Sequence, residues 1–308
     1  MNIDIFKLHM QGFAIGQDGE GKSQYDNWID YYKVAFRTML STDGERTLIC
    51  ALLPRKSAHI NGVISVAFRN GDYSVDMASL CSSLVLDFYI KTIAMQNLNP
   101  KRLQKFPLGV ADKYKSALYC RTLQLNCLTK YYSELWEECY KPSFNSEKWS
   151  INDDRLKPFD TLTANWQWSL PLRNYFERRQ ALVEIDVISA MALGLSLEDL
   201  ELIYTIQFPV LQQNENDTWY DAEGKIVFTC SKGLTGVGLD RPVWNAMRGE
   251  QKDSLTYLGT TPTYEHTIEK SELYRGQKQT FVAPYTCCDR IADYRRAWAH
   301  FAKRFNQE

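Results

Sequence analysis

The feature that most constrains this fold is the order in which hydrophobic periodicities occur along the chain. Helix-like and strand-like patterns come in blocks, without the strand–helix alternation that a doubly wound parallel sheet requires. With 308 residues the chain is long enough for two domains, since a domain has about 100–200 residues. The sequence therefore predicts an α+β fold.

Periodicity and chain-breaking residues divide the chain into three regions. Residues 1–110 are expected to form a mixed lobe with short strands and an amphipathic helix. Residues 111–207 are expected to hold a long spacer helix and a helical hairpin, and residues 208–308 a small α+β region.

In the first region, aromatic and aliphatic residues recur every three or four positions over residues 26–40, which predicts a helix. Strands are expected over residues 46–53 and 60–68. A stripe of apolar residues at i, i+3, i+4, i+7 spacing from Met77 to Phe88 then predicts an amphipathic helix.

The remaining elements follow from heptad-like spacing, capping residues and turn residues. A long helix is expected over residues 113–140 and a linker over 141–160. A helix ended by Gly194 and a second one begun by the capping box at Ser196 form the expected hairpin. The other expected elements are a helix at 171–193, its partner ending at 207, strands at 218–220 and 225–229, and a basic helix at 289–305.

Composition excludes some classes of protein. No apolar run approaches the roughly 18 residues of a membrane span, and the first residues lack a basic region followed by an apolar one, so we expect no membrane partner and a cytoplasmic location. The eight cysteines have no zinc-ligand spacing, which predicts reduced, buried thiols and no metal site.

The net charge of −1 conceals an uneven distribution. Residues 91–121 carry seven basic side chains and one acid, Asp112, and are therefore a candidate footprint for a polyanion. Residues 180–224 contain nine acids and no lysine or arginine, so this stretch is expected to face away from nucleic acid. A module that docks a partner protein through the acidic stretch is one alternative function.

The segment from Gly16 to Ser23 satisfies the phosphate-loop pattern G-x-x-x-x-G-K-[ST]. In that interpretation the backbone around Gly16 and Gly21 would cradle phosphates, Lys22 would reach them and Ser23 would ligate Mg²⁺. Such a loop needs a buried strand before it and a parallel sheet around it, and Gln11-Gly12 interrupts the preceding segment. We favour a flexible glycine-rich loop, with an ATPase or GTPase as the alternative.

Catalytic motifs for adenine methylation do not occur. The reaction requires an Asn/Asp-Pro-Pro-aromatic loop, and the nearest candidate, Asn99-Pro100-Lys101, lacks the second proline and the aromatic residue. A metal-dependent nuclease could be built from Asp217, Glu223 and Lys225, but these residues are better explained as hairpin-turn chemistry. We expect no complete catalytic centre in this chain.

The basic segment from Lys91 to Lys105 is the more promising site. It combines side chains that bind phosphates with amides that can read adenine edges in the major groove. The alternative is a solvated basic connection. The candidate DNA-binding residues are Arg55, Lys56, His59, Lys91, Gln96, Asn97, Asn99, Lys101, Arg102 and Lys105.

Several segments together resemble a known family. Glu45–Pro54 (ERTLICALLP), Leu84–Ile90 (LVLDFYI), Leu103–Leu108 (LQKFPL), Arg121–Thr129 (RTLQLNCLT), Ala181–Ala190 (ALVEIDVISA) and Cys288–Arg295 (CDRIADYR) resemble, in order and spacing, the C-terminal target-recognition region of Type IIG-like adenine-specific DNA methyltransferases. These include the methylases of restriction-modification and phage-defence systems such as DISARM and BREX.

The resemblance covers nearly the whole chain and implies a function. It implies that the chain recognises a specific sequence in double-stranded DNA for an adenine methyltransferase subunit or domain, whose S-adenosylmethionine cofactor would bind to that partner. In the family's terms, residues 45–68 would be core strands, 91–106 a DNA-facing loop, and 113–140 a spacer resembling those of Type I specificity subunits.

Overall fold

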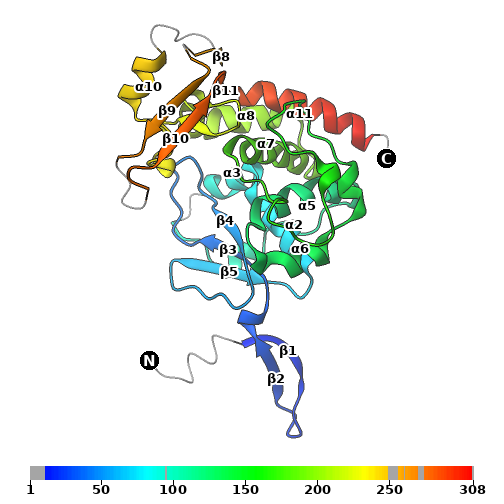
Figure 1. Ribbon diagram of the computed structural model, residues 1–308. Helices are drawn as coiled ribbons and strands as arrows, with labels where there is room; N and C mark the ends of the chain where they lie inside the picture. The colour runs from blue at the N-terminus through cyan, green and yellow to red at the C-terminus, as the bar shows by residue number, and fades with distance from the viewer. Residues whose placement is uncertain (1–10, 94–95, 249–255, 260, 270–273, 307–308) are drawn as a thin grey trace. The chain divides into compact units, whose positions relative to one another are not determined.

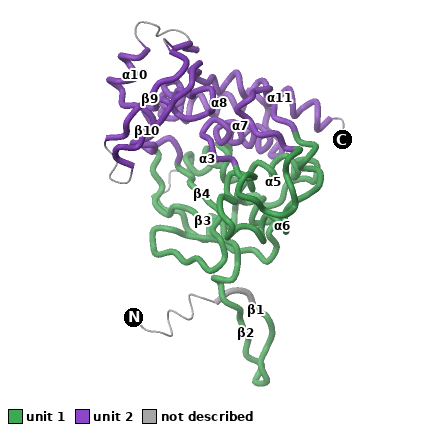
Figure 2. The backbone as a smooth tube through the Cα atoms, in the orientation of Figure 1, with its two compact units in different colours: residues 1–42, 47–147, 160–171 green, residues 43–46, 148–159, 172–308 purple. Residues whose placement is uncertain are grey.

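The computed structural model describes residues 11–93, 96–248, 256–259, 261–269 and 274–306 (Figure 1). Helices and short antiparallel sheets occur together, so the fold is α+β as predicted. The chain forms two compact units, coloured in Figure 2. Unit 1 consists of residues 1–42, 47–147 and 160–171, and unit 2 of residues 43–46, 148–159 and 172–308.

Unit 1 contains a β-hairpin, a three-stranded antiparallel sheet in the order β4-β3-β5, and helices. The strands are β1 (Gln11–Gln17), β2 (Ser23–Asn27), β3 (Lys33–Arg37), β4 (Cys50–Leu53) and β5 (Val63–Ala67). The α-helices are α2 (Gly71–Ser82), α3 (Leu84–Thr92), α4 (Pro100–Leu103), α5 (Asp112–Asn126) and α6 (Ser133–Cys139). Short 3-10 turns are η1 (Trp28–Asp30), η2 (Lys130–Tyr132) and η3 (Pro142–Ser146), and a further one, η4 (Phe159–Thr161), joins segments of the two units.

The core of unit 1 is built on α2 and α5. Helix α2 packs against β3, β4 and α5, and Leu118, Tyr119 and Leu123 of α5 are fully buried. The expected long helix over 113–140 is wrong, because the chain leaves the helix after Asn126 and re-enters one at Ser133. Because α5 is enclosed in the core of unit 1, it is no spacer arm.

Two other expectations for unit 1 are corrected. Residues 26–40, where a helix was expected, contain the end of β2, the turn η1 and the strand β3. The single helix expected from Met77 to Phe88 is two helices, since Ser83 adopts an extended conformation and its hydroxyl accepts a bond from the Leu86 N–H, which begins α3. The expected strand at 46–53 is shorter because Asp87 binds the N–H groups of Thr47 and Leu48.

Unit 2 contains two antiparallel sheets, one of four strands in the order β7-β6-β11-β8 and one formed by β9 and β10. Its strands are β6 (Trp219–Tyr220), β7 (Ile226–Phe228), β8 (Thr256–Tyr257), β9 (Thr263–Thr267), β10 (Lys278–Val282) and β11 (Tyr285–Cys287). Its helices are α7 (Tyr175–Ala192), α8 (Leu197–Gln207), α9 (Pro209–Asn216), α10 (Arg241–Arg248) and α11 (Arg290–Phe305), with the 3-10 turn η5 (Lys232–Leu234).

Local chemistry in unit 2 confirms the expected helical hairpin, β-hairpin and C-terminal helix. Asn174 and Glu177 form a capping box at the start of α7, and Ser196 and Asp199 form one at the start of α8. The carboxylate of Asp221 accepts bonds from the N–H groups of Glu223 and Lys225, which closes the turn between β6 and β7. Of the residues considered for a nuclease, Glu223 and Lys225 therefore belong to a hairpin turn, whereas Asp217 ends α9 and pairs with Arg241 at 2.8 Å.

The three regions expected from the sequence do not follow the boundaries of the two units. Helix α5 belongs to unit 1, whereas α7 and α8 belong to unit 2, although all three fall within residues 111–207. No helix among the residues placed in the structure combines the length and apolar character needed to cross a membrane.

Candidate nucleic-acid interface

The basic segment of unit 1 is anchored to one end of β3 by its backbone. The N–H of Leu40 donates to the Gln96 carbonyl at 2.9 Å, and the N–H of Leu98 donates to the Thr38 carbonyl at 2.8 Å. Leu98 is buried, whereas the neighbouring Gln96 and Asn97 are exposed. Main-chain bonds and one apolar anchor thus hold this segment at the surface.

Helix α4 sets the positions of the basic side chains. The Asn99 side chain accepts a bond from the Arg102 N–H at 3.0 Å, and Pro100 occupies the first helical turn, where its missing N–H costs nothing. Leu103 and Phe106 are buried and fix the segment to the core. Lys101 and Lys105 are left exposed.

Two lysines of this surface lack carboxylate partners among the described residues. The sequence has no aspartate or glutamate between Asp87 and Asp112. Neither Lys101 nor Lys105 forms an ion pair with any residue that the structure describes. The Arg102 guanidinium is half-buried and lies 3.5 Å from the Tyr89 hydroxyl, and Lys91 lies in the last turn of α3. Exposed lysines without carboxylate partners form a site suited to phosphate.

Part of the expected basic footprint belongs to the interior. Arg121 is fully buried and pairs with Glu147 at 3.4 Å, which is likewise buried. Lys115 pairs with Asp112 at 2.7 Å in the first turns of α5. The footprint is therefore smaller than the sequence predicted, and it centres on α4.

Arg55, Lys56 and His59 lie on the connection between β4 and β5. Arg55 pairs with Glu134 at 2.5 Å. Lys56 pairs with Asp30, and its hydrogen bond and charge lower the pKa of that carboxyl. The His59 ring is bonded to the Ser65 hydroxyl at 2.9 Å. These three side chains are thus engaged within unit 1.

The structure separates the two groups of candidate residues. Leu53, just before Arg55 and Lys56, pairs with Lys33 at the start of β3, whereas the segment at 96–98 is bonded just beyond the end of β3. A five-residue strand spans about 14 Å at about 3.4 Å per residue. Arg55 and Lys56 therefore lie at the opposite end of the sheet from Asn97.

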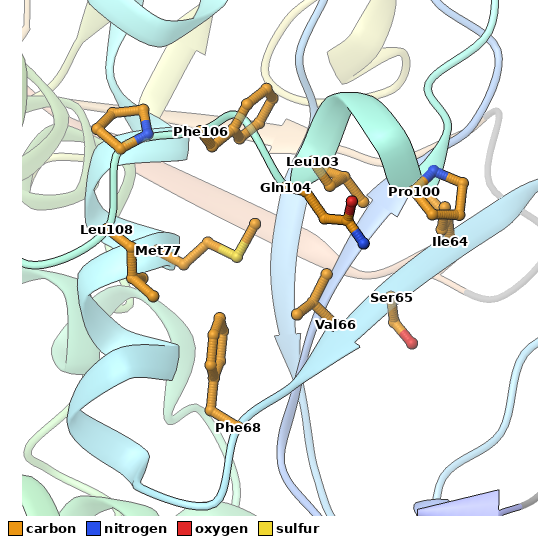
Figure 3. A pocket seen from close by; sticks show the side chains of 11 residues that line it. Ile64, Ser65, Val66, Phe68, Met77, Pro100, Leu103, Gln104, Phe106 and Leu108 are labelled. Atoms are coloured by element: carbon orange, nitrogen blue, oxygen red, sulfur yellow. The ribbon is translucent and has the colours of Figure 1, made fainter.

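An apolar cavity of about 330 Å³ adjoins α4 (Figure 3). It lies between β5, α2 and residues 100–108, all within unit 1. Its walls include Val66, Phe68, Met77, Leu103 and Leu108. No sequence pattern indicated this cavity, because its walls come from three separate segments.

The phosphate-loop pattern belongs to a β-hairpin. Residues 11–17 and 23–27 pair antiparallel as β1 and β2, so a strand follows Lys22 where a phosphate loop needs a helix. The Asp18 carboxylate accepts bonds from the N–H groups of Glu20 at 3.0 Å and Lys22 at 2.8 Å. The turn is therefore ordered by an aspartate, and its N–H groups are not gathered around a phosphate site.

Sequence reasoning missed a buried network of charges in unit 2. Arg290 binds both oxygens of Glu215 and donates to Asp186 at 2.7 Å, and Arg179 bridges Glu215 and Asp293. Burial favours the neutral form of Glu215, but the charges of Arg290 and Arg179 outweigh it and lower the pKa to about 2. The only sequence signal was the presence of acids inside the apolar pattern of α7.

This network corrects the interpretation of the acidic stretch. Four of its nine acids are in the interior of unit 2, namely Glu184, Asp186, Glu215 and Asp221. Their carboxylates accept bonds from groups of unit 2 itself. The stretch is therefore not a continuous acidic surface for docking a partner.

Across the described parts of the chain, no cluster of three or more His, Cys, Asp or Glu side chains is arranged to hold a metal ion. Comparison of the chain with protein-family models, with curated proteins and with solved structures finds no match.

Proposed function

We propose that the chain binds double-stranded DNA through the surface around α4 in unit 1. The observation that carries this proposal is the pair of exposed lysines, Lys101 and Lys105, on a stretch without acids that the core holds in place. Phosphate contacts supply affinity and set the register of a protein on DNA.

The neighbouring amides support sequence recognition as part of the same proposal. Gln96, Asn97 and Gln104 are exposed on this surface, and an Asn or Gln side chain can bind adenine through two hydrogen bonds. The side-chain oxygen of Asn99 already accepts the bond that caps α4, so Asn99 is a positioning residue.

The resemblance in sequence extends the proposal to a partner. We propose that the chain presents DNA to a separate adenine methyltransferase subunit or domain, which would bind S-adenosylmethionine and perform the reaction. The chain itself would contribute binding alone. We expect no transfer of radiolabelled methyl groups from S-adenosylmethionine to DNA by the purified chain, and incorporation above background would overturn this part.

Fluorescence anisotropy with a labelled duplex of mixed sequence at low salt tests the binding. The wild-type chain is expected to bind, and the Lys101→Ala/Lys105→Ala double variant to bind more weakly. A matched control is Lys232→Ala/Lys303→Ala, which removes two exposed lysines of unit 2 and is expected to bind like wild type. Absence of duplex binding by the wild-type chain would overturn the proposal.

A further inference from the structure

The apolar cavity beside α4 suits one kind of occupant. Its walls include Val66, Phe68, Met77 and Leu103, and its volume of about 330 Å³ lies within the range of about 300–1,000 Å³ found for ligand pockets. Figure 3 shows Phe68, Met77 and Val66 directed toward the same space below Leu103. The cavity can therefore hold a flat, apolar group.

The cavity is reached from solvent on the side of residues 104–108. Gln104 is exposed, and Leu108, which also lines the cavity, is 44% exposed. Phe68 is itself partly exposed. An aromatic ring on the wall of an open cavity can stack with a planar ligand.

The rim carries the polar groups. Gln104 lies on the cavity wall between Lys101 and Lys105 in sequence, and its side-chain amide is not bonded to another residue that the structure describes. An amide offers both donors and an acceptor, so it can bond with the edge of a base. The two exposed lysines that flank Gln104 in sequence add positive charge to the same segment.

Charge complementarity distinguishes the possible occupants of the cavity. An aliphatic or aromatic side chain of a protein would fill the depth of the cavity, but it would leave the lysine ammonium groups without anionic partners. A nucleotide matches both features, since its base is flat and its phosphates are anionic. Such a pair of contacts, stacking on a ring beside a basic groove, is how proteins hold unstacked bases.

We propose that this cavity receives one unstacked nucleobase of the bound DNA, with the ring stacked on Phe68, the base edge at Gln104 and the flanking phosphates at Lys101 and Lys105. This inference rests on the proposed function and adds to it the form of DNA that the site prefers. Unpairing a base costs free energy, and the cost is least for a base that has no partner.

The test compares two labelled duplexes of the same mixed sequence, one fully paired and one with a single unpaired adenine. The wild-type chain is expected to bind the duplex with the unpaired base about tenfold more tightly, as base–aromatic stacking allows. Leu108→Trp places a large ring at the opening of the cavity and is expected to abolish this preference while binding of the paired duplex is kept. Phe68→Leu is expected to reduce the preference.

Controls distinguish a failure of the proposed base-binding cavity from a failure of DNA binding itself. Leu202→Trp changes an exposed leucine of unit 2 in the same way and is expected to keep the preference. Thermal unfolding of each variant shows that the fold is intact. Equal binding of both duplexes by the wild-type chain, or a preference kept in Leu108→Trp, would overturn the inference and leave DNA binding standing. Failure to bind either duplex would overturn both.

Discussion

Arg290 and Glu215 form a two-point ion pair in the interior of unit 2, with Nε donating to Oε2 at 2.6 Å and Nη2 donating to Oε1 at 2.9 Å. Arg290 is 7% exposed and Glu215 is 9% exposed. Removing one partner of such a pair leaves an uncompensated buried charge, which costs about 3–5 kcal/mol.

Glu215→Gln is therefore expected to lower the free energy of unfolding by about 3 kcal/mol, the lower end of this range, since Arg290 and Arg179 lose their shared anion but keep Asp186 and Asp293 as partners. Urea unfolding followed by circular dichroism measures this. The control is Glu223→Gln in the same unit, which breaks an exposed pair with Lys225 and should cost less than about 1 kcal/mol. Equal effects of the two changes would contradict the network.

The same pair predicts a dependence of stability on acid. The pKa of Glu215 is about 2 in the folded chain and near 4.5 when unfolded, so its contribution is present above pH 4.5 and is lost as the pH falls toward 2. The lost stability is on the order of 3 kcal/mol. Glu215→Gln should show a smaller decline between pH 4.5 and 2.5, and an identical decline would contradict the assignment.

The buried Lys33 predicts that the stability of the folded chain rises with pH in the alkaline range. Its side chain is buried, its Nζ donates to the Tyr31 carbonyl at 2.9 Å, and burial lowers its pKa to about 8. Below pH 8 the folded chain bears the cost of a buried charge, and this cost disappears as the pH rises from 8 toward 10.5.

Lys33→Met should consequently stabilise the chain at pH 7, by on the order of 1–3 kcal/mol. The gain over wild type should shrink when unfolding is measured at pH 9.5. Lys22→Met, at an exposed position of the β1–β2 turn, serves as the control and should change little at either pH. A gain that is independent of pH would show that Lys33 does not titrate in this way.

The hairpin geometry predicts that the segment from Gly16 to Ser23 binds no nucleotide of consequence, although it matches a phosphate-loop pattern. Titration of labelled ATP and GTP with Mg²⁺ is expected to show no saturable binding at micromolar concentration. Micromolar binding that vanishes in Lys22→Ala would contradict the structure and favour an ATPase or GTPase.

Asn99 offers a way to separate capping from base reading. Asn99→Ala removes the cap of α4 and is expected to cost about 1 kcal/mol, whereas Asn99→Ser keeps a capping oxygen. Both stability and duplex affinity should therefore fall in Asn99→Ala and be kept in Asn99→Ser. Loss of affinity in both variants would indicate that the Asn99 amide contacts DNA directly.

The sequence predicted best those elements that short-range chemistry determines. The capping box at Ser196 and the turn at Asp221 depend on residues within four positions, and both were predicted correctly. Strand β3 was mistaken for a helix because Lys33 to Phe36 are buried on both faces, so no alternation of apolar and polar residues marks the strand.

The candidate site was only partly predictable, because parts of it depend on contacts between segments that are distant in sequence. The basic segment around Lys101 stands out by composition alone. The cavity beneath it needs β5, α2 and residues 100–108 together, and the network at Glu215 needs α7, α9 and α11. Contacts between distant segments leave no periodic signal in any one of them.

If Lys101 and Lys105 contact DNA phosphates, both side chains contribute to the salt dependence of duplex binding. Each phosphate contact releases condensed counterions and contributes a slope of about −0.9 to the plot of log affinity against log salt concentration. Lys101→Ala/Lys105→Ala is expected to flatten the slope by about 1.8, while Lys232→Ala/Lys303→Ala should leave it unchanged. A slope in Lys101→Ala/Lys105→Ala equal to that of wild type would show that these two lysines do not contact DNA phosphates.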